Sequence, residues 1–310
     1  MKLAILFSGQ GAQKPGMGLD FLSDPLFKRI ITDGSQAAGL NLEKIMASRN
    51  GELKRTEFVQ PALVAVSYGI FKMLQHDLPK IPVTAMAGLS LGENCALIAS
   101  GSLAANDGLA LLKDRGRYMQ DDADQVKSTM AAVLKPDTKA VEAICDDLSQ
   151  VWVANYNSPR QIVIGGVADQ VKKAVTAIKD QGAGKRAVIL RVSGAFHTPL
   201  FNGARQKMHQ RLASVNFADP SVPVLSNTTV KPFQAGDIAE IMEHQLAVPT
   251  HFGEDVAAMV NDYDVDATLE IGPGKTLSHF AKQVNRGLKT DHIETVDDYQ
   301  AYLEEHQSWK

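Results

Sequence analysis

Cysteine is scarce in this sequence: Cys95 and Cys145 are the only two among 310 residues. Two thiols are too few for a secreted disulfide scaffold, and neither stands at the spacing of a metal site. The H-E-x-x-H pattern of a zinc-binding helix is also absent. We therefore expect two buried, inert thiols and no bound metal.

An excess of charge of one sign and a long apolar run are missing as well. The chain has 32 Lys and Arg against 35 Asp and Glu, a net charge of -3, whereas nucleic-acid-binding domains are strongly basic. The apolar part of "MKLAILFSGQG" is too short for a signal peptide, and no run reaches the length that spans a bilayer. These absences argue against nucleic acid and membrane as partners and predict a cytoplasmic protein.

The chain does contain short apolar strands that alternate with helices. The pattern predicts strands at 2–7, 83–88, 222–227 and 267–271, and helices at 91–100, at 103–120, within 236–262 and from about Lys275. Strands that alternate with helices form largely parallel sheets. The predicted fold class is therefore α/β.

Residues 129–192 follow another order, which reads strand, helix, strand, strand, helix, strand. This βαββαβ order is the ferredoxin-like arrangement. We assign 128–192 to an inserted ferredoxin-like α+β subdomain, and 1–127 together with 193–310 to a larger domain.

The segment "AGLSLGENC" places Ser90 in the pattern G-x-S-x-G, between a predicted strand and a predicted helix. Such a turn exposes a serine hydroxyl and directs backbone N–H groups at an oxyanion. The same pattern also occurs in structural turns, so a nucleophile and a simple turn both stay open.

A serine nucleophile needs a base, and His197 in "GAFHTPL" is the candidate among eight histidines. Thr198 and Pro199 suit the first positions of a helix that runs to about Val215. The positive end of that helix would keep the imidazole neutral, as a general base requires. An ordinary hydrolase order of serine, acid and late histidine fits poorly, because about a third of the chain follows His197.

Arg115 lies on the apolar face of the predicted helix 103–120, together with Leu111, Leu112 and Met119. A buried guanidinium needs an anionic partner. That partner is either an internal Asp or Glu or the carboxylate of a substrate. In the first loop, the glycines around Gln10 either form a turn only or let its backbone approach a ligand.

Together these motifs resemble the malonyl-CoA:acyl carrier protein transacylases of fatty acid synthesis and the acyltransferase domains of polyketide synthases. The resemblance covers nearly the whole chain, through "FSGQGAQKPGMG", "TEFVQPAL", "GLSLGE", "RGRYMQ", "NYNSPRQIVIGG", "GAFHTPL" and "EIGPGKTL". It implies a hydrolase-like main domain, an inserted ferredoxin-like domain and an active site in the cleft between them.

By matching position, the resemblance implies that Ser90 is the acylated nucleophile and that His197 is its base, oriented by a backbone carbonyl instead of an acid. It also implies an oxyanion hole from the N–H groups of Gln10 and Leu91. Arg115 would bind the free carboxylate of malonyl.

Two further residues follow from the same resemblance. Gln60 is a candidate for the pocket wall. Phe196 resembles the residue of malonyl-specific members, since its bulk fills the space that an α-methyl group needs.

Three positions depart from the family pattern. Leu89 replaces a histidine often found before the serine, Asn94 replaces a common tyrosine, and His251 stands where glutamine or arginine is usual. We expect Leu89 and Asn94 to change the packing around the serine. If the carbonyl of His251 orients His197, the side chain at position 251 matters little.

The implied reaction is ping-pong transfer from malonyl-CoA to the phosphopantetheine thiol of acyl carrier protein, with no cofactor. Acidic carrier proteins dock on basic residues; the candidates are Lys185, Arg186, Lys282 and Arg286. The family expectation is a monomer. The alternatives are a serine thioesterase, a polyketide acyltransferase acting in trans, and an inactive docking module.

Overall fold

The sheet of the larger lobe is parallel, and its central strands are buried. The computed structural model describes residues 1–310. The sheet has the strand order β2-β1-β7-β8, and its strands are β1 (Leu3–Phe7), β2 (Val83–Gly88), β7 (Ala267–Ile271) and β8 (Lys289–Ile293). Every residue of the central strands β1 and β7 is buried, as expected for a parallel sheet that is covered on both faces.

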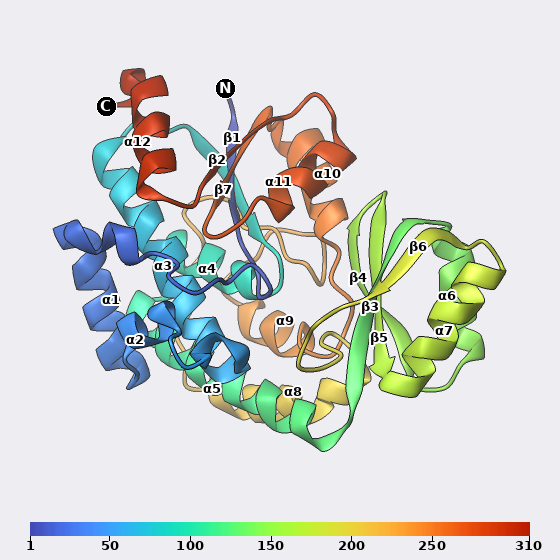
Figure 1. Cartoon of the computed structure of the whole chain (residues 1–310). Helices are drawn as coiled ribbons and strands as arrows, with labels where there is room; N and C mark the ends of the chain where they lie inside the picture. The colour runs from blue at the N-terminus through green and yellow to red at the C-terminus, as the bar shows by residue number, and fades with distance from the viewer.

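Alternate residues of β1 belong to two different hydrophobic clusters. Leu3, Ile5 and Phe7 pack with the helices of one face, whereas Ala4 and Leu6 pack with those of the other. The first face is covered by α3 (Thr56–Asp77) and α4 (Leu91–Ala99), with α5 (Ala105–Gln125) packed against α3. The second face is covered by α10 (Phe252–Tyr263) and α11 (Thr276–Val284) (Figure 1).

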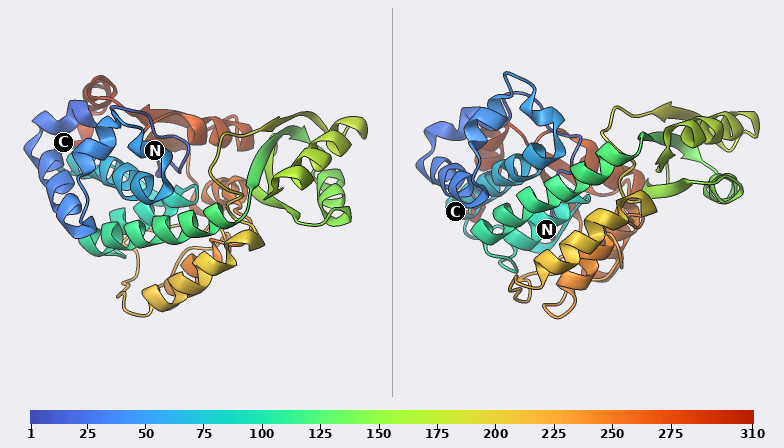
Figure 2. Two further views of the ribbon diagram at one scale, coloured as in Figure 1. Left: turned by 60° about the horizontal axis from the view of Figure 1, so that its bottom comes forward. Right: turned by 90° about the horizontal axis from the view of Figure 1, so that it is seen from below.

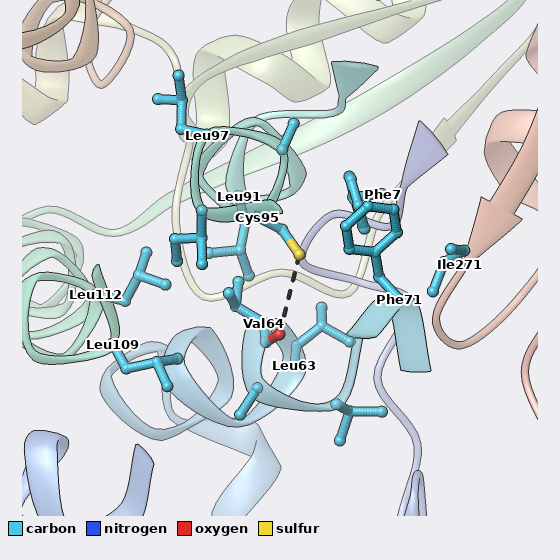
Figure 3. Close-up of a cluster of buried hydrophobic side chains, with 14 of the residues drawn as sticks. Phe7, Leu63, Val64, Phe71, Leu91, Cys95, Leu97, Leu109, Leu112 and Ile271 are labelled. Atoms are coloured by element: carbon cyan, nitrogen blue, oxygen red, sulfur yellow. Dashed lines mark hydrogen bonds between the residues drawn. The ribbon is translucent and has the colours of Figure 1, made fainter. Parts of the chain in front are cut away.

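The cluster on the first face anchors the start of α4. Figure 3 shows Leu91 and Cys95 of α4 against Leu63 of α3 and Phe7 of β1. The Cys95 thiol donates to the carbonyl of Val64 at 3.9 Å. Both cysteines are free and buried, and burial raises the pKa of each thiol, so the prediction of buried thiols is confirmed and their inertness stays a prediction.

The second sheet is antiparallel and forms a smaller lobe beside the first (Figures 1 and 2). Its elements are β3 (Ser128–Pro136), α6 (Thr138–Asp147), β4 (Val151–Ser158), β5 (Gln161–Val167), α7 (Ala168–Asp180) and β6 (Gly184–Ile189). The strand order is β4-β5-β3-β6, and α6 and α7 cover its outer face (Figure 1). The predicted α/β class and the βαββαβ order are confirmed, while the domain boundaries stay a prediction.

The remaining helices complete the larger lobe. They are α1 (Pro25–Ala38), α2 (Leu42–Ala47), α8 (Asn202–Leu212), α9 (Ile238–His244) and α12 (Val296–Glu305). No helix of the structure combines the length and the apolar character needed to cross a bilayer.

Three predicted elements differ from the structure. The strand expected at 222–227 is only a pair of isolated bridges, Met86 with Val224 and Leu225 with Pro232, because Pro223 has no N–H to donate to a ladder. The helix expected at 103–120 starts two residues later and ends at Gln125. The helix expected from Thr198 begins instead as a 3-10 turn, Pro199–Phe201, and α8 follows it.

Candidate active site

Ser90 stands on a sharp turn between β2 and α4. Its backbone is strained, with φ 55° and ψ -96°, a conformation in which a non-glycine residue persists only when its surroundings hold it. Gly92 is needed for this turn, because a Cβ there would lie 2.0 Å from the carbonyl oxygen of Phe7 at the end of β1. The turn therefore has the geometry of a nucleophile elbow.

The loop after β1 packs directly against this elbow. β1 and β2 are neighbours in the sheet, with Phe7 paired to Gly88, so their carboxyl ends meet at one edge. A Cβ on Gly9 would lie 2.4 Å from the carbonyl oxygen of Leu89. Gln10 follows at once, and its N–H donates no hydrogen bond within the chain.

The N–H of Leu91 belongs to the first turn of α4, where N–H groups have no acceptor of their own within the helix. The N–H groups of Gln10 and Leu91 thus have no acceptor in the chain, and both residues line one cavity with Ser90.

His197 makes two hydrogen bonds of 2.7 Å, one between Nε2 and Ser90 Oγ and one in which Nδ1 donates to the carbonyl oxygen of Gln245. A carbonyl only accepts, so Nδ1 carries the proton and Nε2 presents its lone pair to the serine hydroxyl. The pair has the arrangement of a nucleophile and its base, although it lies 107 residues apart in the chain.

Burial lowers the pKa of His197 from 6.5 to about 4; the bond to the Gln245 carbonyl opposes this effect and the charge of Arg115 adds to it. The imidazole is therefore neutral at pH 7. The sequence suggested that a helix N-terminus would keep His197 neutral. Burial does so instead, since the 3-10 turn Pro199–Phe201 separates His197 from α8.

Arg115 is buried, with 1% of its surface exposed, and points its guanidinium between two amides. It donates to Gln60 Oε1 and to Gln245 Oε1, each at 2.8 Å. No carboxylate lies within 4.0 Å of it, so Arg115 has no direct internal ion pair, and the charge of Glu93 acts on it from farther away. Burial lowers the pKa of Arg115 to about 10, which leaves it charged at pH 7.

Gln245 connects the three groups just described. Its carbonyl holds His197 and its side-chain oxygen accepts from Arg115. Its Nε2 donates to the Ser90 carbonyl at 3.2 Å and to the carboxylate of Glu93. One residue thus fixes the distance between serine, base and arginine.

A second hydrogen-bond network, centred on Asn227, holds the Ser90 turn in place. Asn227 Oδ1 accepts from the Ser90 N–H at 2.7 Å, and Asn227 Nδ2 donates to the Gly88 carbonyl and to Asp255 Oδ2. The Asn227 N–H donates to Glu93 Oε1 at 2.8 Å. Burial raises the pKa of both acids, that of Asp255 to about 8. These carboxyl groups are structural members of the elbow rather than groups open to a substrate.

A cavity of about 790 Å³ opens above the serine between the two lobes. Of the residues expected at the site, six line it: Gln10, Ser90, Leu91, Arg115, Phe196 and His197. Gln60 does not; it lies behind Arg115 and holds it, which corrects its expected place in the wall. The four basic docking candidates, Lys185, Arg186, Lys282 and Arg286, are exposed and lie outside the lining of the cavity.

The three departures from the family pattern have distinct places. Leu89 lines the cavity, and Asn94 is buried, with its Nδ2 donating to the Ser90 carbonyl at 3.4 Å. His251 does not orient His197, because that carbonyl belongs to Gln245. Its ring stacks on Tyr156 with 4.8 Å between centroids, and its Nδ1 lies 2.7 Å from Glu254.

Gln245, Asn227 and Asp255 were missed from the sequence. Gln245 and Asn227 lie 155 and 137 residues from Ser90, which each of them contacts. Asp255 reaches the elbow only through Asn227. Glu93 alone carried a local signal, as an acid in an otherwise apolar helix, "LGENCALIA".

The chain is similar to proteins of known activity over nearly its whole length. Residues 5–301 match the family model described as acyl transferase domain. The malonyl CoA-acyl carrier protein transacylase of Bacillus subtilis (strain 168) is 36% identical over 296 residues, which are 93% of this chain and 92% of that protein. Its counterpart from Escherichia coli (strain K12) is 34% identical over 289 residues, 91% and 93% of the two chains.

Solved structures agree with these relatives. The MCAT of Streptococcus pneumoniae superposes with a TM-score of 0.92 at 39% identity, covering 98% of this chain and all 100% of that one. PlMCAT, a malonyl-transacylase solved in complex with its type II PKS acyl-carrier protein AntF, gives a TM-score of 0.93 at 30% identity, covering 99% and 100%.

Proposed function

The chain belongs to the acyl transferase domain family, and from that membership we propose that it transfers malonyl from malonyl-CoA to the phosphopantetheine thiol of an acyl carrier protein in fatty acid synthesis. The observation that carries the proposal is a serine with a neutral base at 2.7 Å in one cavity with a buried, charged arginine. The reaction is ping-pong acyl transfer through malonyl-Ser90.

In the first half-reaction, His197 Nε2 takes the Ser90 proton while Oγ attacks the thioester carbon. The N–H groups of Gln10 and Leu91 donate to the resulting oxyanion. The C–S bond then breaks, and the coenzyme A sulfur takes the proton from Nε2. The imidazolium is held meanwhile by the Gln245 carbonyl, which accepts from Nδ1.

In the second half-reaction, the carrier thiol gives its proton to His197 and attacks the malonyl-Ser90 ester. The same oxyanion site serves this step, because the attacked carbonyl occupies the same place. Collapse releases malonyl on the carrier and returns the proton to Ser90 Oγ. No cofactor or metal enters either step.

Arg115 supplies the preference for a dicarboxylic acyl group. Its two amide partners leave its charge uncompensated within 4.0 Å, and a guanidinium binds a carboxylate through two parallel hydrogen bonds. Phe196 lines the same cavity and packs on Phe201 with 5.1 Å between ring centroids, so it restricts a branched acyl group.

Docking of the carrier on the exposed Lys185, Arg186, Lys282 and Arg286 stays part of this proposal, as do a monomeric state and a cytoplasmic location. The thioesterase, the polyketide acyltransferase and the inactive module become outcomes of the test below.

Intact-mass measurement after mixing with malonyl-CoA tests the proposal. We expect one malonyl group on Ser90, which passes to a phosphopantetheinylated carrier protein, with no adduct in Ser90→Ala and a normal adduct in the exposed control Ser214→Ala. An adduct that is lost only to water indicates a thioesterase. Transfer to a polyketide carrier alone indicates the polyketide role, and no adduct with retained carrier binding indicates an inactive module.

A further inference from the structure

Two cations at the Ser90 cavity have no partner within the chain. Lys54 and Arg191 both line the cavity and are both exposed. Neither side chain makes a hydrogen bond or an ion pair shorter than 4.0 Å. Arg55, beside Lys54, differs in both respects, since it pairs with Glu57 at 2.6 Å and lies outside the cavity.

A hydrogen bond brings the segments that carry these cations together. Thr56 Oγ1 lies 3.1 Å from Ser193 Oγ, and each of these residues stands two positions after one of the cations. Two extended residues span at most about 7 Å. The Cα atoms of Lys54 and Arg191 therefore lie within about this distance of the Cα atoms of Thr56 and Ser193, respectively. Thr56 Oγ1 also accepts from Gln10 Nε2 at 3.2 Å, which ties the same place to the loop beside Ser90.

The charges that line the cavity do not balance. The cations are Lys54, Arg115 and Arg191, and the one carboxylate in the lining belongs to Glu270. That carboxylate accepts from the N–H groups of Leu277 and Ser278 at 3.1 and 2.8 Å, at the start of α11. After Arg115 is assigned to malonyl, Lys54 and Arg191 therefore remain at the entrance without an anionic partner. Two such cations attract anions.

Both substrates of the proposed reaction bring an anion to this entrance. Malonyl-CoA and the carrier protein each present a pantetheine arm whose sulfur reaches the serine and whose far end carries a phosphate. Arg115, inside the cavity, is assigned to the malonyl carboxylate. The exposed Lys54 and Arg191 then suit the phosphate, because Arg and Lys bind phosphate by charge-assisted hydrogen bonds.

We propose that Lys54 and Arg191 form a phosphate-binding pair for the pantetheine arm that malonyl-CoA and the carrier protein share; this site rests on the proposed function above. The pair holds donor and acceptor arms in turn with the same two charges. It contributes to binding at the entrance, and the chemistry at Ser90 is unchanged by its removal.

The test compares malonyl-4′-phosphopantetheine with malonyl-pantetheine, two thioesters that differ by the phosphate alone. In the double variant Lys54→Gln, Arg191→Gln, we expect kcat/KM for Ser90 acylation to fall about tenfold to a hundredfold with the phosphorylated donor. With malonyl-pantetheine it should stay within about twofold of wild type. Added salt should slow the wild type with the phosphorylated donor more than the variant.

Arg55→Gln is the matched control, because it removes the same charge from the next residue without touching the cavity. An equal loss in this control, an equal loss with both donors, or no loss with either overturns the phosphate-binding pair. Failure of malonyl-CoA itself to acylate wild-type Ser90 rejects the proposed function instead, so the two failures are distinguishable.

The acceptor half-reaction separates the sources of the anion. A shared phosphate site predicts a similar loss when malonyl-Ser90 is discharged by phosphopantetheine and by the loaded carrier, and little loss with pantetheine. A loss with the carrier protein alone would show that Lys54 and Arg191 bind the surface of that protein, and would overturn the proposal. A loss with malonyl-CoA but not with malonyl-4′-phosphopantetheine would assign them to the nucleotide and would overturn it as well.

Discussion

Replacing Asp255 by asparagine should make the protein more stable at neutral pH. Asp255 has no exposed surface; its Oδ2 accepts from Asn227 Nδ2 at 2.7 Å and its Oδ1 has no partner. Burial raises its pKa from 3.8 to about 8, and the Asn227 hydrogen bond opposes that effect only in part. The side chain of an asparagine at position 255 has the same shape, can direct its oxygen at Asn227 Nδ2, and does not ionise.

The magnitude follows from the protons that folding binds. Between pH 4 and pH 8 the folded protein holds a proton on Asp255 that the unfolded chain has released, so the free energy of unfolding falls as pH rises through this range. At pH 7, the interval above the unfolded value of 3.8 is about 3 pH units, and about 1.4 kcal/mol per unit gives about 4 kcal/mol. Asp255→Asn should therefore gain almost nothing at pH 4 and about 4 kcal/mol at pH 7.

Urea unfolding of wild type and variant at pH 4 to 8 measures this difference. The wild-type decline between these pH values should be shallower in the variant, with part of it retained because burial also raises the pKa of Glu93. Asp262→Asn on the same helix is the control; its side chain is exposed, so a change below about 1 kcal/mol is expected. A variant that is less stable at every pH, or one with the wild-type slope, would refute the reasoning.

Three other outcomes follow from the cavity. Arg115→Gln should lower kcat/KM for malonyl-CoA about a hundredfold. With acetyl-CoA, kcat/KM should stay unchanged or rise slightly, because loss of the Arg115 charge raises the pKa of His197. The exposed control Arg117→Gln should change neither, and an equal loss with both substrates in stopped-flow assays would contradict the assignment of Arg115. The kcat/KM for Ser90 acylation, which reports the free enzyme, should stay flat from pH 8 to about 5 and fall only near the His197 pKa of about 4. A midpoint near 6.5 in this pH profile would argue against a buried neutral base. Phe196→Ser should raise the methylmalonyl-to-malonyl ratio about tenfold in a competition assay, and an unchanged ratio would remove Phe196 from substrate selection.

Local patterns predicted the parts of the fold that local interactions form. The strands at 83–88 and 267–271 have the expected bounds, because a short apolar run that ends at a glycine turn is typical of a buried strand. The long helix α3 was not predicted. Its sixth residue is Pro61, which normally marks a helix boundary, and burial of almost the whole helix outweighs that preference.

The candidate site divides in the same way. Ser90 and His197 each stand in a distinctive local frame, and the family motifs paired them. Gln245 has no such frame; its contacts with Arg115 and Ser90 join residues 130 and 155 positions apart. A side chain whose role depends wholly on tertiary contacts leaves no periodic or turn signal in the sequence.

The electrostatics of Arg115 and His197 connect substrate choice with catalysis. The charge of Arg115 helps to lower the pKa of His197, so the empty site holds a neutral but weak base. A malonyl carboxylate on Arg115 offsets that charge and therefore raises the pKa of the imidazole, which makes it a stronger base once the correct acyl group is bound. An acetyl group brings no carboxylate and leaves the base weak. Discrimination between the two acyl groups should thus appear in the acylation rate constant as well as in binding, because the same guanidinium governs both.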